Sequence, residues 1–452
     1  MSRLFGTDGV RGIANTELTP ELAFQLGRAA ARVLATQTDP EAPFVVGRDT
    51  RISGTMLEGA IIAGVTSAGR DAVSVGILPT AAVAIVTRRT NAAAGCMISA
   101  SHNPIADNGI KFFSADGFKL SDESEQQIED ALTDDANSRP TGAAIGIARI
   151  ALNLGAHYYD ALYEHAGDLS GLTVVVDAAF GAAYAIAPYV LRKLGATVHE
   201  LNCEADGARI NVDCGATDLG PLRQRVRELI ERGEERVIGV AYDGDADRAQ
   251  FVDETGSALN GDHVLLILAQ ALHRSGDLAG NGVVGTVMSN FGLEEALKRD
   301  GISLVRAPVG DRYVLEAMRT GGYLLGGEQS GHIIDLRRNT TGDGPMTTVT
   351  LLSLLTASEM RLHDAASQMQ SYPQILLNVA GCSKETLRDP TVTQSISQAE
   401  QQLGANGRIL VRASGTEPVI RIMVEGKDQS QIDRLAQGLA TEVAAASGRV
   451  RG

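Results

Sequence analysis

The residues of this chain that could do chemistry gather in four short polar loops, and the acidic loop is the easiest to interpret. Asp243, Asp245 and Asp247 alternate with small residues in DGDADR, directly after the apolar run VIGVAY. Three carboxylates that turn toward one point need a cation, and all-oxygen ligation favours Mg²⁺, Mn²⁺ or Ca²⁺ over zinc. The loop is not a calcium EF-hand, because its sixth position, which requires glycine, is Arg248. The spacing predicts a divalent-metal site beside a guanidinium, which suits a phosphoryl group.

A second loop, SASHNP, follows the apolar run AAAGCMI and presents Ser101. Asn103 and Pro104 indicate that the preceding strand has ended. A serine opposite a metal site could act as a nucleophile that carries a phosphoryl group. Acyl transfer lacks support, because the chain has no GxSxG motif and no Ser–His–Asp arrangement can be read around Ser101.

The loop RASGTEP at 412–418 has the composition of a phosphate cradle. Arg412 can grip a phosphate bidentately, while Ser414, Thr416 and the amides around Gly415 can donate to the remaining oxygens. The alternative is a hairpin turn with incidental polarity. Arg421, on the following strand-like run, either adds to this site or faces solvent.

The fourth loop, GEQSGH at 327–332, offers a carboxylate and a hydroxyl two positions apart. Glu328 and Ser330 could face one ligand together and would suit adjacent sugar hydroxyls. The alternative is a glycine-rich turn with a solvated glutamate. A lone histidine such as His332 is more often structural than catalytic.

Several isolated basic residues are ambiguous from their type alone. Lys111, in DNGIKFF, could carry a proton or serve as a counter-charge near phosphate. Without other information such residues are surface groups, and the same expectation holds for Arg11, Arg48 and Arg51.

The elements that must position these loops alternate along most of the chain. FVVG at 44–47 precedes a helical pattern at 55–68, and LTVVVDA at 172–178 precedes another at 184–193. Such alternation predicts α/β architecture with mostly parallel sheets. Loops at the carboxyl ends of such strands converge on one crevice, so the polar loops predict one site shared between domains.

The C-terminal part departs from this alternation. Two strand-like runs at 408–413 and 419–426 precede an amphipathic helical pattern at 430–446, which indicates an α+β module. We therefore predict three related α/β domains with mixed or mostly parallel sheets and a smaller C-terminal α+β domain around a central cleft. The expected domains are residues 1–154 with the serine loop, 155–260 with the acidic loop, 261–371 with GEQSGH and 372–452 with RASGTEP.

Composition narrows the class of protein. The 452 residues carry a net charge of −15, which argues against nucleic acid or an anionic membrane surface as a partner. The four cysteines lie far apart without a CxxC pair, so free thiols in a reducing compartment are favoured over zinc or disulfides. No apolar stretch reaches the length of a membrane span and the N-terminus has no apolar leader, so we expect a cytoplasmic protein. The sequence leaves the oligomeric state open between a monomer and a homodimer.

Taken in order, FGTDGVRG, SASHNP with DNGIKFF, DGDADR, GEQSGH and RASGTEPVIRIMVEG resemble the α-D-phosphohexomutase superfamily. The resemblance runs from residue 4 to about 427, nearly the whole chain. Gln329 and Asp311, together with the opening LFGTDGVRG, resemble the bacterial branch that acts on glucosamine phosphates. CGATD at 214–218 departs from the CGSTH expected there, with Ala216 and Asp218 in place of serine and histidine, which puts local contacts in doubt.

The resemblance implies roles for individual residues. Ser101 would be the phosphoserine, and its phosphate would share Mg²⁺ with the acidic triad Asp243, Asp245 and Asp247. Glu328 and Ser330 would contact the sugar hydroxyls. The non-reacting phosphate would be held by Arg412, Ser414, Gly415 and Thr416, with Arg421 as an additional candidate. Lys111 and His332 become candidate proton carriers, and Arg11, His102 and Arg248 candidate stabilisers of the moving phosphoryl group.

The implied reaction interconverts glucosamine 6-phosphate and glucosamine 1-phosphate through glucosamine 1,6-bisphosphate, toward UDP-N-acetylglucosamine and the cell wall. Three rival functions stay open: a non-catalytic phosphosugar-binding protein, a metal-dependent phosphatase, and a phosphoglucomutase or phosphomannomutase. Release of inorganic phosphate would identify a phosphatase, and sugar preference would separate the mutases.

Overall fold

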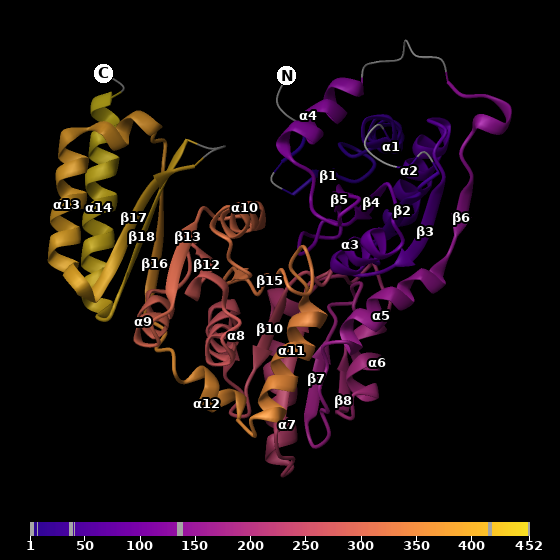
Figure 1. The fold of residues 1–452 in the computed structure, drawn as a ribbon. Helices are drawn as coiled ribbons and strands as arrows, with labels where there is room; N and C mark the ends of the chain where they lie inside the picture. The colour runs from indigo at the N-terminus through magenta and orange to yellow at the C-terminus, as the bar shows by residue number, and fades with distance from the viewer. Residues whose placement is uncertain are drawn as a thin grey trace.

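The computed structural model describes residues 4–6, 8–35, 39, 41–132, 139–414 and 418–450. Its strands form four sheets of six, five, four and three strands, each built from one continuous part of the chain. The sheets and their helices make four units, which follow one another in chain order, with the first and the fourth at opposite ends (Figure 1). The predicted fold class is confirmed.

The first unit is a mixed sheet in the order β1-β5-β4-β2-β3-β6, in which β2 lies parallel to β3 and β4 while β5 runs antiparallel to its neighbours. In this order β4 is one of the two central strands, so the serine loop that follows it begins in the middle of the sheet. Its elements are β1 (Val10–Ile13), α1 (Pro20–Ala35), β2 (Phe44–Arg48), α2 (Gly54–Ser67), β3 (Ala72–Ile77), α3 (Thr80–Arg89), β4 (Ala94–Ile98), β5 (Asp107–Ser114), α4 (Asp122–Ala131) and β6 (Ala148–Ile150).

The second and third units repeat the α/β theme with sheet orders β11-β10-β9-β7-β8 and β13-β12-β14-β15. The second comprises α5 (Ala156–Tyr163), β7 (Thr173–Asp177), α6 (Ile186–Lys193), β8 (Thr197–Leu201), α7 (Gly220–Glu231), β9 (Val237–Tyr242), β10 (Ala249–Val252) and β11 (Ala258–Leu259). The third comprises α8 (Gly261–Ser275), β12 (Gly282–Thr286), α9 (Phe291–Arg299), β13 (Ser303–Ala307), α10 (Asp311–Gly321), β14 (Leu325–Gly327), β15 (Ile333–Asp335), α11 (Gly344–Ala357) and α12 (Leu362–Ala366).

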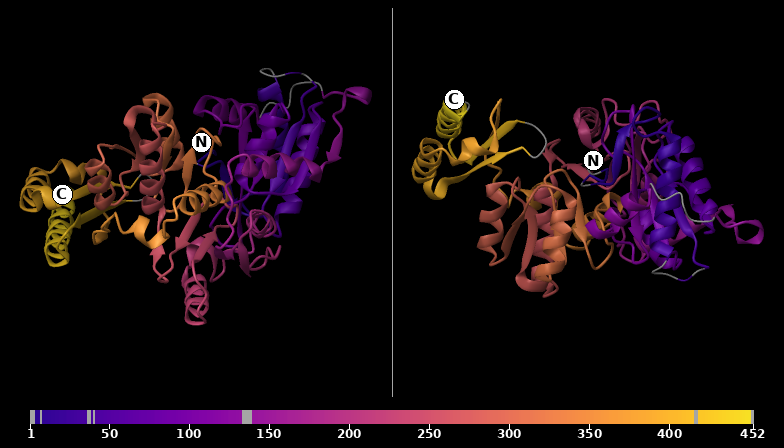
Figure 2. Two further views of the ribbon diagram at one scale, coloured as in Figure 1. Left: turned by 60° about the horizontal axis from the view of Figure 1, so that its bottom comes forward. Right: turned by 90° about the horizontal axis from the view of Figure 1, so that it is seen from above.

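The fourth unit is an antiparallel sheet in the order β16-β18-β17, and Figure 2 shows it standing apart from the first unit. Its elements are β16 (Gln374–Ala380), α13 (Pro390–Leu403), β17 (Gly407–Ala413), β18 (Val419–Gly426) and α14 (Gln429–Val450). The residue limits predicted for the four domains stay a prediction.

Capping side chains determine where three of the helices begin. Ser121, Asn290 and Asp343 precede α4, α9 and α11, and each side chain accepts a hydrogen bond from an amide in the first turn that would otherwise lack a partner. These caps fix where the helices begin and therefore where the preceding loops point.

The cores show which units are joined. One continuous buried cluster contains Leu172 and Val240 of the second unit together with Leu266 and Leu352 of the third. The fourth unit instead has a separate core around Ile422, between its sheet and α13 and α14. The second and third units therefore share one core, and a further cluster joins Ile85 of the first unit to Ile186 of the second and Met346 of the third, whereas the fourth unit has a core of its own.

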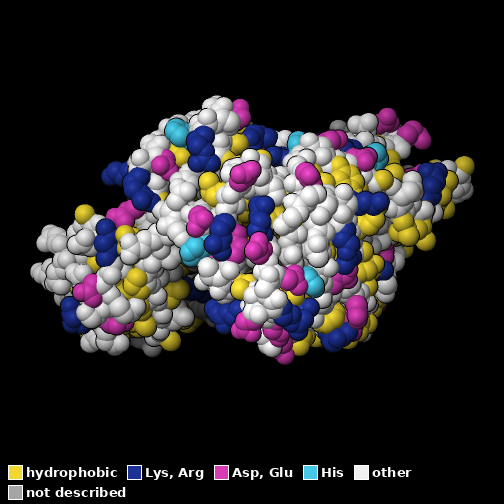
Figure 3. Space-filling view, turned by 90° about the horizontal axis from the view of Figure 1, so that it is seen from below, with side chains coloured by type: hydrophobic (Ala, Val, Ile, Leu, Met, Phe, Trp, Pro, Cys, Tyr) yellow, Lys and Arg dark blue, Asp and Glu magenta, His cyan; other side chains and the backbone are white. Residues whose placement is uncertain are grey.

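On the face seen from below, Lys and Arg side chains lie interspersed with Asp and Glu (Figure 3). Within the described part of the chain, none of the helices combines the length and the apolar character that crossing a membrane requires.

Candidate active site

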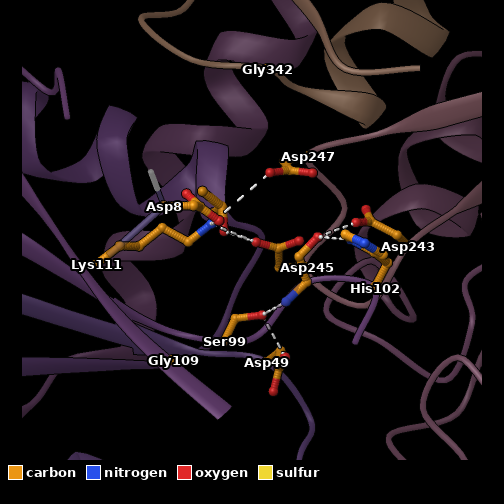
Figure 4. Close-up of polar contacts among 12 residues, drawn as sticks. Asp8, Asp49, Ser99, His102, Gly109, Lys111, Asp243, Asp245, Asp247 and Gly342 are labelled. Carbon is orange, nitrogen blue, oxygen red and sulfur yellow. Dashed lines mark hydrogen bonds and ion pairs between the residues drawn. The ribbon is translucent and has the colours of Figure 1, made fainter. Parts of the chain in front are cut away.

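The serine loop and the acidic loop meet across the boundary between the first and second units. Ser101, just beyond the end of β4, donates a hydrogen bond from Oγ to Asp243 Oδ2 over 2.6 Å, and Asp243 directly follows β9. Ser101 is buried and has a φ of +51°, in the left-handed region that a residue with a side chain adopts at a cost. The serine loop and the acidic loop therefore meet at one place, as the sequence predicted for these two loops (Figure 4).

The acidic triad is compact and buried. One carboxylate oxygen from each of Asp243, Asp245 and Asp247 lies within 4.8 Å of the others. Burial and the neighbouring carboxylates raise the pKa of Asp243 well above its usual range. Asp245 Oδ1 and Asp247 Oδ1 are buried and accept no hydrogen bond from the described residues. Buried carboxylate oxygens that lack donors are suited to a hard cation, so the triad fits Mg²⁺.

Lys111 is not the surface group that its residue type suggested. Its side chain is only 3% exposed, and Nζ lies 3.0 Å from Asp245 Oδ2, 3.4 Å from Asp8 Oδ2 and 4.0 Å from Asp247 Oδ2. Burial alone would lower the pKa of Lys111, but Asp245 and Asp8 raise it above its usual value, so the ammonium is retained. Thr80 also donates to Asp245 Oδ2, which fixes that carboxylate from a further side.

A ring of alternating charge links the first three units. From Lys111 it passes through Asp8 to Lys119, whose ammonium bridges Asp8 of the first unit and Asp311 of the third. From Asp311 it continues through His332 to Asp247 and back to Lys111. We call this set of six residues the charge ring: Lys111, Asp8, Lys119, Asp311, His332 and Asp247.

His332 lies inside the charge ring between two carboxylates. Nδ1 is 3.5 Å from Asp247 Oδ2, and Nε2 is 3.7 Å from Asp311 Oδ2. Burial would lower the pKa of His332, but Asp247 and then Asp311 raise it to about 9. The Gly342 amide nitrogen lies 3.2 Å from Nε2, so the neutral ring also has a donor for its free nitrogen. The His332 imidazole therefore has hydrogen-bonding partners both when it is doubly protonated and when it is neutral.

Three further predicted residues, His102, Arg248 and Arg11, contact the serine loop or the acidic loop. His102 Nδ1 lies 3.3 Å from Ser101 Oγ, and burial together with Arg248 and Arg11 lowers the pKa of His102 to about 4. Arg248 Nε lies 3.9 Å from Asp243 Oδ2 and 3.8 Å from Asp247 Oδ1, while Arg11 pairs with Asp8. His102 therefore contacts the Ser101 hydroxyl and Arg248 contacts the triad, while the action of these residues on a phosphoryl group stays a prediction.

Arg51 corrects the expectation of a surface arginine. It is 1% exposed and pairs with the buried Asp49, with 3.0 Å between Nε and Oδ2. It also donates to backbone carbonyls of the serine loop, including that of Ser101 at 2.8 Å. Arg48, expected beside it on the surface, is half-buried and pairs with Glu58 at 2.9 Å.

The GEQSGH loop follows β14 of the third unit and is held by its own contacts. The Gly310 amide donates to Glu328 Oε1 over 2.9 Å, and Ser330 Oγ lies 3.5 Å from Glu328 Oε2. Gln250 of the second unit donates to the Ser330 carbonyl over 3.2 Å. Glu328 and Ser330 therefore lie close together, and their binding of adjacent sugar hydroxyls stays a prediction.

The RASGTEP residues lie on the fourth unit. Arg412 on β17 stands directly opposite Arg421 on β18, so this register places two like charges on neighbouring strands. Ser414, at the end of β17, is buried, while Gly415 and Thr416 lie outside the described residues. Of the described residues in this group, Arg412 and Ser414 lie outside the hydrogen-bonded cluster around Ser101, on the fourth unit at the opposite end of the molecule from the first (Figure 1).

Family models of known proteins match consecutive stretches of the chain. They describe phosphoglucomutase/phosphomannomutase alpha/beta/alpha domain I at residues 2–139, domain II at 156–256, domain III at 260–372 and the C-terminal domain at 376–442. The chain belongs to the phosphoglucomutase/phosphomannomutase family. This membership confirms the resemblance to the α-D-phosphohexomutases that the five motifs indicated.

Individual proteins agree with the family assignment. A phosphoglucosamine mutase of Thermoanaerobacter sp. (strain X514) is 50% identical over 445 residues, which cover 97% of this chain and 98% of that protein. A phosphoglucomutase/phosphomannomutase family protein of Burkholderia thailandensis has a TM-score of 0.84 at 24% identity and covers 99% of this chain and 98% of its own. The Aspergillus fumigatus N-acetylphosphoglucosamine mutase, solved in complex with GlcNAc-6P and magnesium, has a TM-score of 0.65 at 17% identity, covering 98% of this chain and 96% of its own. The relative from Thermoanaerobacter confirms the predicted isomerase function, and the two structures show the fold.

Sequence reasoning missed several residues that the structure places beside these loops. Lys119 and Asp49 drew no attention, because neither lies in one of the four polar loops. Asp8 could have been found, since it lies inside the motif FGTDGVRG. The departure at CGATD is locally accommodated: Asp218 accepts a hydrogen bond from the Gly220 amide over 2.8 Å at the start of α7.

Proposed function

We propose that this chain interconverts glucosamine 6-phosphate and glucosamine 1-phosphate through a phosphorylated Ser101 and a glucosamine 1,6-bisphosphate intermediate. The observation that carries the proposal is the buried Ser101 hydroxyl, which lies 2.6 Å from a carboxylate of a metal-binding triad on the neighbouring unit. The name of the half-identical relative supports the amino-sugar substrate, and the ligands of the Aspergillus enzyme support a phosphosugar and magnesium.

In this proposal Asp243, Asp245 and Asp247 hold Mg²⁺ together with the phosphate of Ser101. When bound, the ion supplies charge neutralisation at the phosphoryl oxygens, which phosphoryl transfer requires along with accurate positioning. Lys111 keeps Asp245 in place through the ion pair at 3.0 Å, and the Arg248 amide donates to Asp243 Oδ1 over 3.2 Å. The chain therefore orients its own carboxylates before any ligand arrives.

The first transfer breaks the bond between Ser101 Oγ and phosphorus and forms one between phosphorus and a sugar hydroxyl oxygen. The proton of that hydroxyl must leave, and Ser101 Oγ must gain one. Lys111 and His332 are the candidate proton carriers, and His102 is within 3.3 Å of Ser101 Oγ. Arg11, His102 and Arg248 face the moving phosphoryl group, where positive charge and donors stabilise the transition state.

The 1,6-bisphosphate then turns within the cleft and returns its other phosphate to Ser101. Glu328 and Ser330 would bind the sugar hydroxyls in either orientation. The opposed guanidiniums of Arg412 and Arg421, with Ser414, Gly415 and Thr416, would hold whichever phosphate is not reacting, because they read charge rather than sugar stereochemistry. A cytoplasmic location and a homodimer stay predictions, which cell fractionation and analytical ultracentrifugation can check.

The test compares glucosamine 6-phosphate with glucose 6-phosphate and mannose 6-phosphate, with Mg²⁺ and a trace of glucose 1,6-bisphosphate, followed by ³¹P NMR. We expect at least a hundredfold preference for the amino sugar, about 2.7 kcal/mol. Equal or reversed preference would move the chain to a neighbouring branch of the family. Inorganic phosphate released in place of the isomer would show a phosphatase and overturn the proposal.

A further inference from the structure

We propose that Arg51 is a positioning residue for the phosphoryl transfer: it holds the backbone of the serine loop so that Ser101 Oγ faces the acidic triad. This inference rests on the proposed function, since it assumes that Ser101 carries the phosphoryl group. Arg51 touches neither the triad nor the residues proposed to bind the sugar in any contact that the structure shows, so it would act through the loop alone.

The five N–H donors of the Arg51 guanidinium are all used. Nη2 donates to the carbonyls of Ser101 and Asn103, each over 2.8 Å. Nη1 donates to the carbonyls of Pro104 over 2.6 Å and Asp107 over 3.0 Å. The fifth donor, Nε, pairs with Asp49. One side chain therefore satisfies four carbonyls of a loop that turns around it.

The loop makes two turns of its own, in which the Asn103 amide donates to the Ala100 carbonyl over 3.0 Å and the Asp107 amide to the Pro104 carbonyl over 3.1 Å. Between β4 and β5 no strand pairing supports it, and Ser101 takes a φ of +51° although it is not a glycine. Such a conformation costs on the order of 1–3 kcal/mol and persists only where the surroundings impose it. The carbonyl oxygen of Ser101, bound by Arg51, is two bonds from Cα, and Cα carries the side chain that ends in Oγ, so the guanidinium constrains the nucleophile through its own backbone.

A second contact ties the same serine to the same ion pair. Ser99 Oγ accepts a hydrogen bond from the Ser101 amide over 2.9 Å and donates one to Asp49 Oδ2 over 2.6 Å. Asp49 also accepts from the Arg51 amide over 2.9 Å. The Ser101 peptide is thus fixed at its nitrogen through Ser99 and at its carbonyl through Arg51, and Asn211 of the second unit donates to the same carbonyl over 2.9 Å. Burial raises the pKa of Asp49 to about 6, and the nearby Arg51 and the hydrogen bond from Ser99 oppose that rise.

The alternative is that Arg51 only stabilises the fold, as many buried arginines do. The two roles differ in what they predict for the folded, loaded enzyme. Displacement of a reacting group by about 1 Å can cost about a hundredfold in rate. A positioning role therefore lowers kcat per phosphorylated molecule and leaves KM for the sugar phosphate nearly unchanged, because Glu328, Ser330 and the fourth unit do not contact Arg51. A purely structural role lowers only the amount of folded protein.

The experiment uses Arg51→Lys, Ser99→Ala and the matched control Arg48→Lys, each in the full chain. Lysine keeps the charge at 51 but cannot reach four carbonyls and Asp49 at once, since it has three donors. Arg48 lies three positions earlier and pairs with Glu58 instead of the serine loop. Each protein is loaded with glucose 1,6-bisphosphate, its phosphoserine content is measured by intact mass, and kcat and KM are referred to the phosphorylated fraction.

We expect kcat to fall about a hundredfold in Arg51→Lys and at least tenfold in Ser99→Ala, with KM within about threefold of wild type. Arg48→Lys should keep both values. In a further variant, Arg51→Ala, loaded and measured in the same way, guanidinium at low millimolar concentration should restore part of the lost kcat, whereas methylammonium should not. An unchanged kcat per phosphorylated molecule in Arg51→Lys or Ser99→Ala would overturn the inference.

A second variant and the activity of the wild type separate the possible outcomes. If Arg51→Lys does not fold, Ser99→Ala carries the test, because it removes only one hydroxyl from the chain. Failure of the proposed function would appear in the wild type, as turnover of a different hexose phosphate, and the ratio of variant to wild type would then be measured on that sugar. Failure of the positioning role appears only in that ratio.

Discussion

Lys119 should contribute more to stability than any isolated surface lysine, because it joins two units through the charge ring. Its ammonium pairs with Asp8 of the first unit and Asp311 of the third, and its side chain is 13% exposed. Replacing it with methionine, which has a similar length, leaves both carboxylates without their shared partner. Asp8 keeps Arg11 and Lys111, and Asp311 keeps His332.

Breaking a buried ion pair from one side costs about 3–5 kcal/mol. Because each carboxylate keeps another cation, we take the lower end and expect the free energy of unfolding to fall by about 3 kcal/mol. For a unit of about 150–250 residues that corresponds to a decrease in melting temperature of about 6–12 °C. Urea and thermal unfolding, both followed by far-UV circular dichroism, measure the two quantities.

Lys427→Met is the matched control, since Lys427 pairs with Glu295 while their side chains are 41% and 35% exposed. Such a pair contributes about 0–1 kcal/mol. Adding Asp311→Asn to Lys119→Met should recover part of the loss, because it removes a carboxylate that has lost its counter-charge. Equal losses in Lys119→Met and Lys427→Met would refute the reasoning that the charge ring holds the first and third units together.

Three further predictions follow from the site and the core. Ser101→Ala should abolish mutase turnover while folding stays intact, and full activity in that variant would remove the phosphoserine mechanism. Mg²⁺ should raise the melting temperature of the wild type but much less that of Asp243→Asn; equal shifts would place the ion elsewhere. Burial raises the pKa of Asp262 to about 6, so the folded state keeps a proton that the unfolded state releases. From about pH 4 to pH 7 the wild type should therefore lose about 3 kcal/mol of stability relative to Asp262→Asn, and parallel pH curves would contradict this.

Much of the candidate site could be predicted from the sequence because its chemistry is local. The alternation in DGDADR places three carboxylates within five residues, and an apolar run before each polar loop indicates a strand end. Strand–loop–helix alternation likewise predicted the α/β units and the different C-terminal module. In each case the interactions that decide the structure lie within one element or one turn, so the order of residue types is enough.

The tertiary structure alone decided which of the charged residues cooperate. Ser101 and Asp243 are 142 positions apart, and Lys119 and Asp311 are 192 positions apart, so no local pattern joins them. Lys119, Asp49 and Arg51 have the residue types of an ordinary surface, and only the packing of the units removes them from water and gives them partners. Burial and pairing of charge depend on which chain segments meet, and that is a property of the folded molecule rather than of any short stretch of its sequence.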